Sequence, residues 1–242
     1  MDSGDYILDV MARIVADAWY WFVRAVVKWG FFRLGGGFAV RGANRVPRSG
    51  GLIVAANHVS NLDPPALACS LPRRLTFMAK EELFKGLFGS LIGSLGAFPI
   101  RRGVGDMEAI RSAVGFLEGG HALMVLPEGT RGDGLTLLPF TRGVEMLARK
   151  TGALIVPVGI VGTQGRLPRG ASKPRLGKVI VAYGEPYRYA DVAGPFTPDL
   201  ERRIIELCRA NGYEVKSASS SSPSQGASPR ESPAEGQTLG RA

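Results

Sequence analysis

Between residues 51 and 210, short apolar runs alternate with segments whose apolar residues recur at helical spacing. The apolar runs are residues 51–56, 75–79, 121–126, 154–161 and 178–183. The segments with helical spacing are residues 82–95, 106–118, 141–150 and 197–210. Strands that alternate with helices build a sheet covered by helices, most often a largely parallel one. We therefore expect a single α/β domain with a largely parallel or mixed sheet flanked by helices.

Proline and glycine positions predict where the last helix begins and ends, and a break in one of the strands. The last helix has Thr197 as its N-cap candidate and Pro198 at its first position, and it should end at the Asn211-Gly212 pair. Pro157 lies inside the apolar run 154–161 and is expected to interrupt that strand, because proline has no N–H for a sheet ladder.

The N-terminal segment, residues 6–33, is apolar but broken by charges. On a helix four of its charged residues fall within a sector of about 60°; they are Arg13, Asp17, Arg24 and Lys28. The apolar residues on the far side are Trp19, Phe22, Val23, Val26 and Trp29. These charges do not fit a bilayer span, which needs roughly 20 mostly apolar residues, and no small-residue cleavage site marks a secretory signal.

Two interpretations of residues 1–35 remain open. One is an amphipathic helix that lies in the membrane interface, with its aromatic residues inserted and its cations among the headgroups. The other is a helix that packs on its own domain. The interface is favoured because all three tryptophans of the chain lie in this segment.

The charge and composition of the chain limit the classes of ligand that it could bind. The chain has 30 Lys+Arg against 21 Asp+Glu, a net charge of +9, which favours anionic lipid, a phosphorylated substrate or nucleic acid. Residues 217–242 are rich in Ser, Pro and Gly and are expected to be disordered. They carry two charges of each sign, so the excess of cations lies in the rest of the chain, which we divide into residues 1–35 and a domain over residues 36–216. A nucleic-acid-binding tail is therefore disfavoured. Two cysteines exclude a disulfide scaffold and a Cys-rich zinc site, and two histidines exclude a site that needs three imidazoles.

The sharpest motif is NHVSNLD, residues 57–63, directly after the apolar run 51–56. Open α/β sheets bind ligands beyond the carboxyl ends of their strands, so His58 lies where chemistry is expected. A tight turn could bring Asp63 back to one imidazole nitrogen, which would fix the tautomer and leave the other nitrogen as a general base. The alternative is a capping aspartate beside an incidental loop histidine.

A second motif, PEGTR at residues 127–131, directly follows the run 121–126. Arg131 offers a planar set of donors that matches phosphate or carboxylate, and Gly129 lets the backbone approach a ligand closely. Glu128 could accept a hydroxyl hydrogen bond or hold Arg131 in place. A solvated surface turn explains the same residues.

Further cations are expected at the same edge of the sheet. Arg101 and Arg102 follow a possible strand end, and Lys80 closes the run at 75–79. Such residues suit a phosphate, although a solvated basic turn explains the arginine pair equally well. The run 166–178 holds five cations and could receive coenzyme A phosphates or anionic lipid, or be a solvated loop.

Taken in order, these motifs resemble those of the 1-acyl-sn-glycerol-3-phosphate acyltransferase (PlsC-type) family, from about Arg41 to Tyr187. The resemblance implies that His58 is the catalytic base and Asp63 its orienting acid. It assigns the binding of substrate phosphate to Lys80, Arg102, Glu128, Gly129, Thr130 and Arg131. It also implies that Val156–Val158 line the acyl or acceptor site.

The activity implied by the resemblance is O-acyl transfer from acyl-CoA or acyl carrier protein to the free hydroxyl of 1-acyl-glycerol-3-phosphate, giving phosphatidic acid in phospholipid biosynthesis. It calls for no metal or cofactor, and it places the enzyme as a peripheral or monotopic protein on the cytoplasmic face of the cell membrane. Its partners would be an anionic membrane surface, a lysophospholipid and an acyl donor, without nucleic acid. The alternatives are another lysolipid or headgroup as acceptor, or a basic lipid-binding protein without catalysis.

Some residues leave the mechanism or the acceptor open. Ser60 or Cys69 would serve as nucleophile in an acyl-enzyme route, although Ser60 is close in sequence to His58 and Cys69 lies in an apolar stretch. Leu126 and Gly132 replace the Phe and Ser that often flank the second motif. Arg101 stands where the family often has an acidic residue, which puts the acceptor headgroup in doubt.

Overall fold

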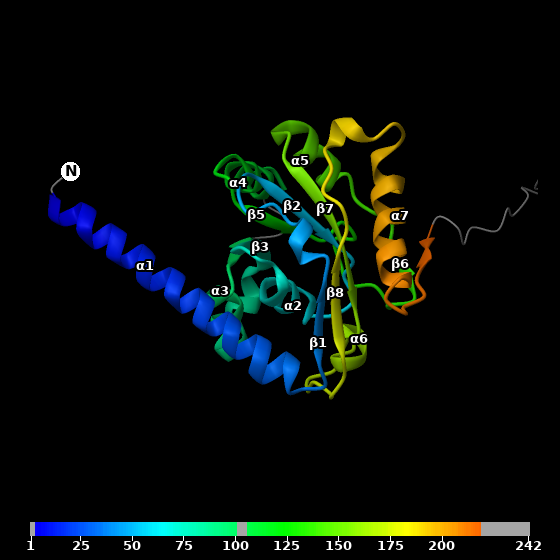
Figure 1. The fold of residues 1–242 in the computed structure, drawn as a ribbon, viewed down its shortest axis with the longest axis horizontal. Helices are drawn as coiled ribbons and strands as arrows, with labels where there is room; N and C mark the ends of the chain where they lie inside the picture. The colour runs from blue at the N-terminus through cyan, green and yellow to red at the C-terminus, as the bar shows by residue number, and fades with distance from the viewer. Residues whose placement is uncertain (1–2, 101–105, 219–242) are drawn as a thin grey trace, which may run out of the picture.

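The computed structural model describes residues 3–100 and 106–218, which form a seven-stranded mixed sheet between two layers of helices (Figure 1). The strand order is β1-β8-β7-β2-β5-β3-β4, and every neighbouring pair is parallel except β7 with β8. The strands are β1 (Phe38–Arg41), β2 (Leu52–Ala56), β3 (Leu75–Lys80), β4 (Ala97–Ile100), β5 (Ala122–Val125), β7 (Leu154–Val161) and β8 (Val179–Tyr183). The predicted α/β class with a mixed sheet is confirmed.

The helices divide between the two faces of the sheet. One face is covered by α1 (Ser3–Val26) with the π-helical turn η1 (Val27–Arg33), by α2 (Asp63–Ser70), and by α3 (Gly86–Ser94) with the 3-10 turn η3 (Glu81–Phe84). The other face is covered by α4 (Asp106–Glu118), α5 (Gly143–Thr151) and α7 (Phe196–Arg209). The smaller elements are η2 (Ala43–Arg45), β6 (Thr136–Leu137), α6 (Thr163–Arg166), η4 (Tyr189–Asp191) and β9 (Lys216–Ser217), and β9 pairs with β6.

Strand β2 shows why the apolar runs do not alternate with polar residues. All five of its residues are buried. Leu52, Val54 and Ala56 pack into the cluster beneath α2 and η1, whereas Ile53 and Ala55 pack into the cluster beneath α5 and α7. A strand covered on both faces needs apolar side chains on both, so its sequence is a continuous hydrophobic run.

The prediction that Pro157 interrupts its strand is wrong, because β7 runs unbroken from Leu154 to Val161. The Pro157 carbonyl accepts a hydrogen bond from the Gly184 N–H at 2.9 Å, on the side of β8. The antiparallel ladder with β8 begins only at the Val158–Tyr183 pair. Pro157 therefore lies just before the ladder with β8, while it stays in register with Ala55 of β2 on the other side.

The predicted N-terminal helix is present, but its orientation differs from the expectation that its charges face lipid headgroups. Asp17 forms an ion pair with Arg74 of the domain. Arg24 donates hydrogen bonds to the carbonyls of Ala68 (2.9 Å) and Leu71 (2.7 Å) at the end of α2. In its second half α1 therefore packs on the domain through these polar contacts and through Tyr20, which is fully buried.

The outward side of α1 and η1 is apolar. Its exposed side chains are Met11, Ile14, Val15, Trp19, Phe22, Val26 and Trp29. None of the helices in the described part of the chain is long and apolar enough to cross a bilayer. The tail predicted to be disordered lies outside the described residues from 219 onward, while Ser217 ends β9.

Candidate active site

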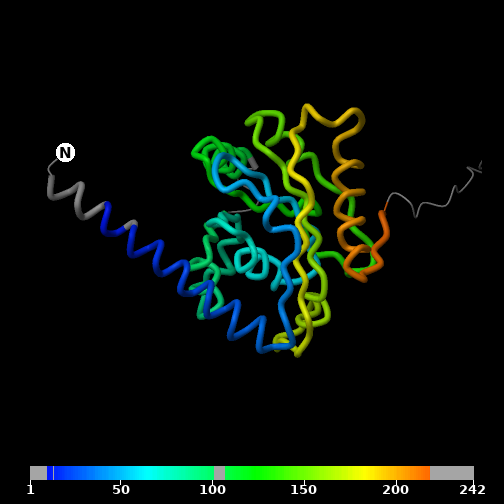
Figure 2. Tube along the Cα trace, viewed as in Figure 1, coloured from blue at the N-terminus to red at the C-terminus, as the bar shows by residue number. Residues whose placement is uncertain are grey.

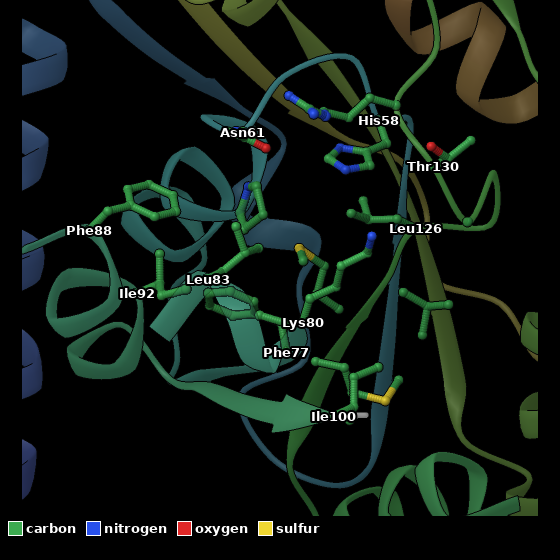
Figure 3. Close-up of a pocket in the computed structure, with 17 residues that line it drawn as sticks. His58, Asn61, Phe77, Lys80, Leu83, Phe88, Ile92, Ile100, Leu126 and Thr130 are labelled. Atoms are coloured by element: carbon green, nitrogen blue, oxygen red, sulfur yellow. The ribbon is translucent and has the colours of Figure 1, made fainter. Parts of the chain in front are cut away.

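A cleft of about 370 Å³ opens at the carboxyl ends of β2, β3 and β5 (Figure 3). Its polar side holds His58, Asn61, Lys80 and Arg131, and its apolar side is formed mainly by β3, η3 and α3. The apolar lining residues include Phe77, Leu83, Phe88, Ile92 and Ile100. The cleft therefore joins a cationic region to a hydrocarbon-like one.

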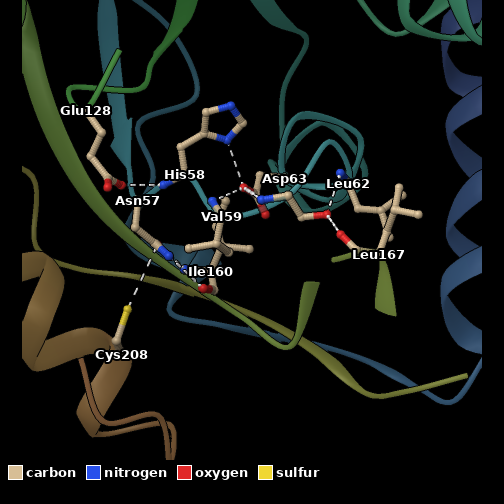
Figure 4. A network of polar contacts seen from close by, with 10 residues as sticks. Asn57, His58, Val59, Leu62, Asp63, Glu128, Ile160, Leu167 and Cys208 are labelled. Carbon is tan, nitrogen blue, oxygen red and sulfur yellow. Dashed lines mark hydrogen bonds and ion pairs between the residues drawn. The ribbon is translucent and has the colours of Figure 1, made fainter. Parts of the chain in front are cut away.

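The His58 imidazole is held by the Asp63 carboxylate (Figure 4). His58 Nδ1 lies 2.9 Å from Asp63 Oδ2, and the same oxygen accepts the backbone N–H groups of Val59 (2.7 Å) and Ser60 (2.8 Å). Asp63 is fully buried at the first residue of α2, where the helix dipole stabilises a negative charge. Because a carboxylate only accepts, Nδ1 donates its proton and Nε2 keeps a lone pair.

This ring is accessible, as the prediction for a general base requires. The His58 side chain is 15% exposed and lines the cleft. Figure 3 shows the Lys80 side chain extending toward the same space. The pair predicted from residues 57–63 is therefore formed, with the imidazole between the buried carboxylate and the open cleft.

Glu128 is buried behind the histidine, and both of its carboxylate oxygens bind backbone N–H groups. Oε1 accepts the His58 N–H at 2.7 Å and Oε2 accepts the Leu138 N–H at 2.9 Å. The Gly132 N–H in turn donates to the His58 carbonyl at 2.8 Å. The contact of Glu128 with Arg131, one of the two roles suggested by the sequence, is not formed, because the carboxylate is turned toward the loop that carries His58. Burial raises the pKa of Glu128, and the two N–H donors offset part of this rise.

Asn57 is a buried residue beside the site for which sequence reasoning predicted no role. Its side chain is buried and exchanges two hydrogen bonds with the backbone of Ile160, at 2.9 Å to the carbonyl and 2.7 Å from the N–H. These bonds fasten the end of β2 to β7, one residue before the histidine. The sequence did contain a signal for this residue, because a polar side chain directly follows the apolar run 51–56.

The remaining predicted residues fall into three groups. Those lining the cleft are Lys80, Gly129, Thr130 and Arg131. Arg102, like Arg101, lies outside the described residues. Val156 and Val158 do not line the cleft, which corrects the expectation for that segment: they are buried in β7, a strand flanked by β2 and β8.

The two alternative nucleophiles are both inside the domain. Ser60 is fully buried, and its hydroxyl donates to the Leu167 carbonyl at 2.8 Å. Cys69 is fully buried in α2, where burial raises the pKa of its thiol to about 12. Neither side chain faces the cleft, so the geometry favours direct attack by a substrate hydroxyl over an acyl-enzyme route. Within residues 3–100 and 106–218, no three His, Cys, Asp or Glu side chains gather to hold a metal ion.

Comparison with known proteins identifies related chains. A family model described as Acyltransferase matches residues 37–161. The 1-acyl-sn-glycerol-3-phosphate acyltransferase of Bacillus subtilis is 29% identical over 184 residues, covering 72% of this chain and 89% of that one. The lyso-ornithine lipid O-acyltransferase of Pseudomonas aeruginosa is 36% identical over 142 residues, covering 58% of this chain and 54% of that one.

A solved structure is also similar. The crystal structure of the 1-acyl-sn-glycerophosphate (LPA) acyltransferase PlsC from Thermotoga maritima matches with a TM-score of 0.68 and 28% identity. The match covers 83% of this chain and 80% of that one.

We expect neither cysteine to react with a thiol reagent while the protein is folded. Cys69 and Cys208 are both fully buried, and burial raises the pKa of each thiol to about 12. Titration with 5,5′-dithiobis(2-nitrobenzoic acid) at neutral pH should release colour only after denaturant is added. Rapid reaction of one thiol in the native protein would contradict this placement.

Glu128→Gln should lower the free energy of unfolding by about 1–3 kcal/mol, because the new NH₂ group faces a backbone N–H that needs an acceptor. Urea unfolding followed by circular dichroism measures this loss. The matched control is Glu118→Gln at the exposed end of α4, which should change stability by less than about 0.5 kcal/mol. Equal effects of the two substitutions would show that the Glu128 carboxylate does not hold the loop.

Proposed function

Because the chain belongs to the Acyltransferase family, we propose that it transfers a fatty acyl group from a thioester donor to the free hydroxyl of 1-acyl-glycerol-3-phosphate, giving phosphatidic acid. The observation that carries the proposal is the His58 imidazole, held by buried Asp63 and open to a cleft with cations. The donor is acyl-CoA or acyl carrier protein, and either supplies the same thioester.

In the proposed mechanism His58 Nε2 takes the proton of the acceptor hydroxyl while that oxygen attacks the thioester carbonyl carbon. A C–O bond forms, and collapse of the tetrahedral intermediate breaks the C–S bond. The departing thiolate takes the proton from the imidazolium, which the Asp63 carboxylate stabilises in the meantime. A general base positioned in this way contributes about 10²–10⁴ in rate.

The cations of the cleft suit the phosphate of the acceptor. Arg131 offers a fork of N–H donors and Lys80 a compact positive charge. Arg102 is assigned to the same phosphate by family resemblance. Holding this group fixes the distance from the free hydroxyl to His58, which lowers the barrier by orienting the reactants. The apolar side of the cleft suits a fatty acyl chain.

We place the enzyme on the membrane through the outward side of α1. A helix normally packs its apolar side on its own domain. Here Asp17 and Arg24 contact the domain, while Trp19, Phe22 and Trp29 remain exposed. An interfacial helix inserts such aromatic side chains at the level of the headgroups. We accordingly propose peripheral or monotopic attachment to the cytoplasmic face of an anionic membrane.

A second candidate is the acylation of another lysolipid. It is favoured by the similarity to the lyso-ornithine lipid O-acyltransferase of Pseudomonas aeruginosa. The cations of the cleft favour an acceptor with an anionic headgroup. A panel of lysolipid acceptors with both donors would separate the two candidates, and thiol release from acyl-CoA would separate either from a lipid-binding protein without catalysis.

His58→Ala should lower the rate of acyl transfer by about 10²–10⁴, because the base that takes the hydroxyl proton is lost. Thiol release from acyl-CoA after addition of lysophosphatidic acid measures the rate. His121→Ala is the matched control, since this second histidine is exposed and does not line the cleft. Unchanged turnover in a folded His58→Ala protein would reject the mechanism.

Arg131→Ala should raise the KM for lysophosphatidic acid roughly 10- to 100-fold, because a hydrogen bond between charged groups is lost. The value of kcat should change less, since His58 and Asp63 stay in place. Arg111→Ala, at an exposed position of α4, serves as the control. An acceptor KM equal to that of the control would remove Arg131 from the phosphate site.

A further inference from the structure

The exposed apolar side of α1 does not end with the helix. Trp29 is followed by Leu34, which caps η1 in a helical conformation with φ −72° and ψ −28°. Leu34 is 81% exposed. Removing an apolar side chain of this size from water is favourable, so its exposure needs an explanation. Leu34 lies where the interfacial helix joins β1.

A segment distant in sequence lies beside Leu34. The Gly177 N–H donates to the Gly35 carbonyl at 2.9 Å. Gly36 has φ +122°, and a Cβ there would collide with the backbone of Gly177. This close approach places Leu176, which is 83% exposed, near Leu34. Figure 2 shows the two segments meeting at the bottom of the molecule, where the blue trace meets the yellow-green one.

Arg166 holds the two segments together. Its side chain is buried and donates to the carbonyls of Phe31 (2.9 Å) and Arg175 (3.2 Å), with its guanidinium 4.3 Å from the Phe31 ring. The five cations of residues 166–178 therefore fall into two groups. Arg166 fastens the loop to η1, and the cations that follow remain on the surface.

The exposed cations of this region have no acidic neighbours in the sequence. Residues 27–41 and 162–184 contain no Asp or Glu. In the part of the chain that the structure covers, no ion pair involves Arg33, Lys173, Arg175 or Lys178, all of which are exposed. We call residues 33–36 and 173–178 the basic tip. It combines two protruding leucines with four unpaired positive charges.

We propose that the basic tip is a second membrane contact, which binds anionic phospholipid headgroups and inserts Leu34 and Leu176 beside them. This rests on the proposed function, since it assumes an enzyme that works at a lipid surface. Anionic lipids attract clustered Lys and Arg side chains, and exposed leucines next to such cations suit the boundary between headgroups and acyl chains. A soluble phosphate ligand would explain the cations but not the leucines.

The tip also continues the surface of α1. The outward apolar residues Met11, Val15, Trp19, Phe22, Val26 and Trp29 follow one another at spacings of three or four, so they form one stripe. Leu34 and Leu176 lie beyond its C-terminal end. With the tip bound, the membrane would contact the stripe along α1 and also the region beyond its C-terminal end. These two contacts would fix the tilt of the domain and the height of the cleft above the lipid.

The test measures binding of the full chain to vesicles of phosphatidylcholine, with and without phosphatidylglycerol, by flotation. The tip variants are K173Q/R175Q/K178Q and L34S/L176S. The matched control, R111Q/K150Q/K216Q, removes the same charge from exposed positions on α4, α5 and β9, away from the tip. Thiol release in detergent micelles is measured for every variant.

We expect K173Q/R175Q/K178Q to bind phosphatidylglycerol vesicles about fivefold more weakly for each cation removed, while binding to neutral vesicles is unchanged. L34S/L176S should weaken binding to both kinds of vesicle. All variants should keep the micellar activity of the unaltered protein. Binding of K173Q/R175Q/K178Q equal to that of the control would overturn the proposal, as would a raised KM for acyl-CoA with unchanged vesicle binding.

These measurements distinguish a failure of the acyltransferase proposal from a failure of the basic-tip proposal. Absence of thiol release in the unaltered protein, with the vesicle results as expected, would reject the acyltransferase proposal and leave the tip as a lipid contact. Normal thiol release with the tip variants binding like the control would reject the tip alone.

Discussion

The site depends on the hydrogen bonds that the buried Asp63 carboxylate accepts. Asp63 is fully buried, and one oxygen accepts the His58 ring and two backbone N–H groups. A buried charge is costly unless it is hydrogen-bonded, and here the N-terminus of α2 adds a favourable dipole. The same contacts close the turn after β2, so the geometry that stabilises the charge also aims the imidazole at the cleft.

Helix α2 connects this site to the surface of the protein. It begins with Asp63, and its last carbonyls accept hydrogen bonds from Arg24 of α1. A second connection runs from the Ser60 hydroxyl to the Leu167 carbonyl, next to Arg166, which binds the carbonyl of Phe31. The element that we place on the membrane and the loop that carries His58 are therefore joined through short, partly buried hydrogen bonds.

Burial separates two kinds of charged residue around the cleft. Asp63 and Glu128 are buried: one oxygen of Asp63 binds the His58 ring and backbone N–H groups, and both oxygens of Glu128 bind backbone N–H groups. Lys80 and Arg131 line the cleft, and within residues 3–100 and 106–218 neither side chain forms an ion pair. A carboxylate in the open cleft would repel a phosphate, so turning both carboxylates inward leaves a cationic opening. In the proposed mechanism Asp63 orients the base, and the cations bind the phosphate of the acceptor.

The sequence by itself determined the α/β class and the site pair, because both depend on local pattern. Apolar runs of strand length separated by helical segments predict the layers, and polar residues directly after those runs predict His58 and Asp63 at the sheet edge. Only the tertiary structure decided which side of α1 faces the domain, that Glu128 holds the His58 loop rather than Arg131, and that Val156–Val158 lie in the core. These outcomes depend on contacts between residues far apart in the chain, such as His58 with Glu128, seventy positions on, whose energies no local pattern records.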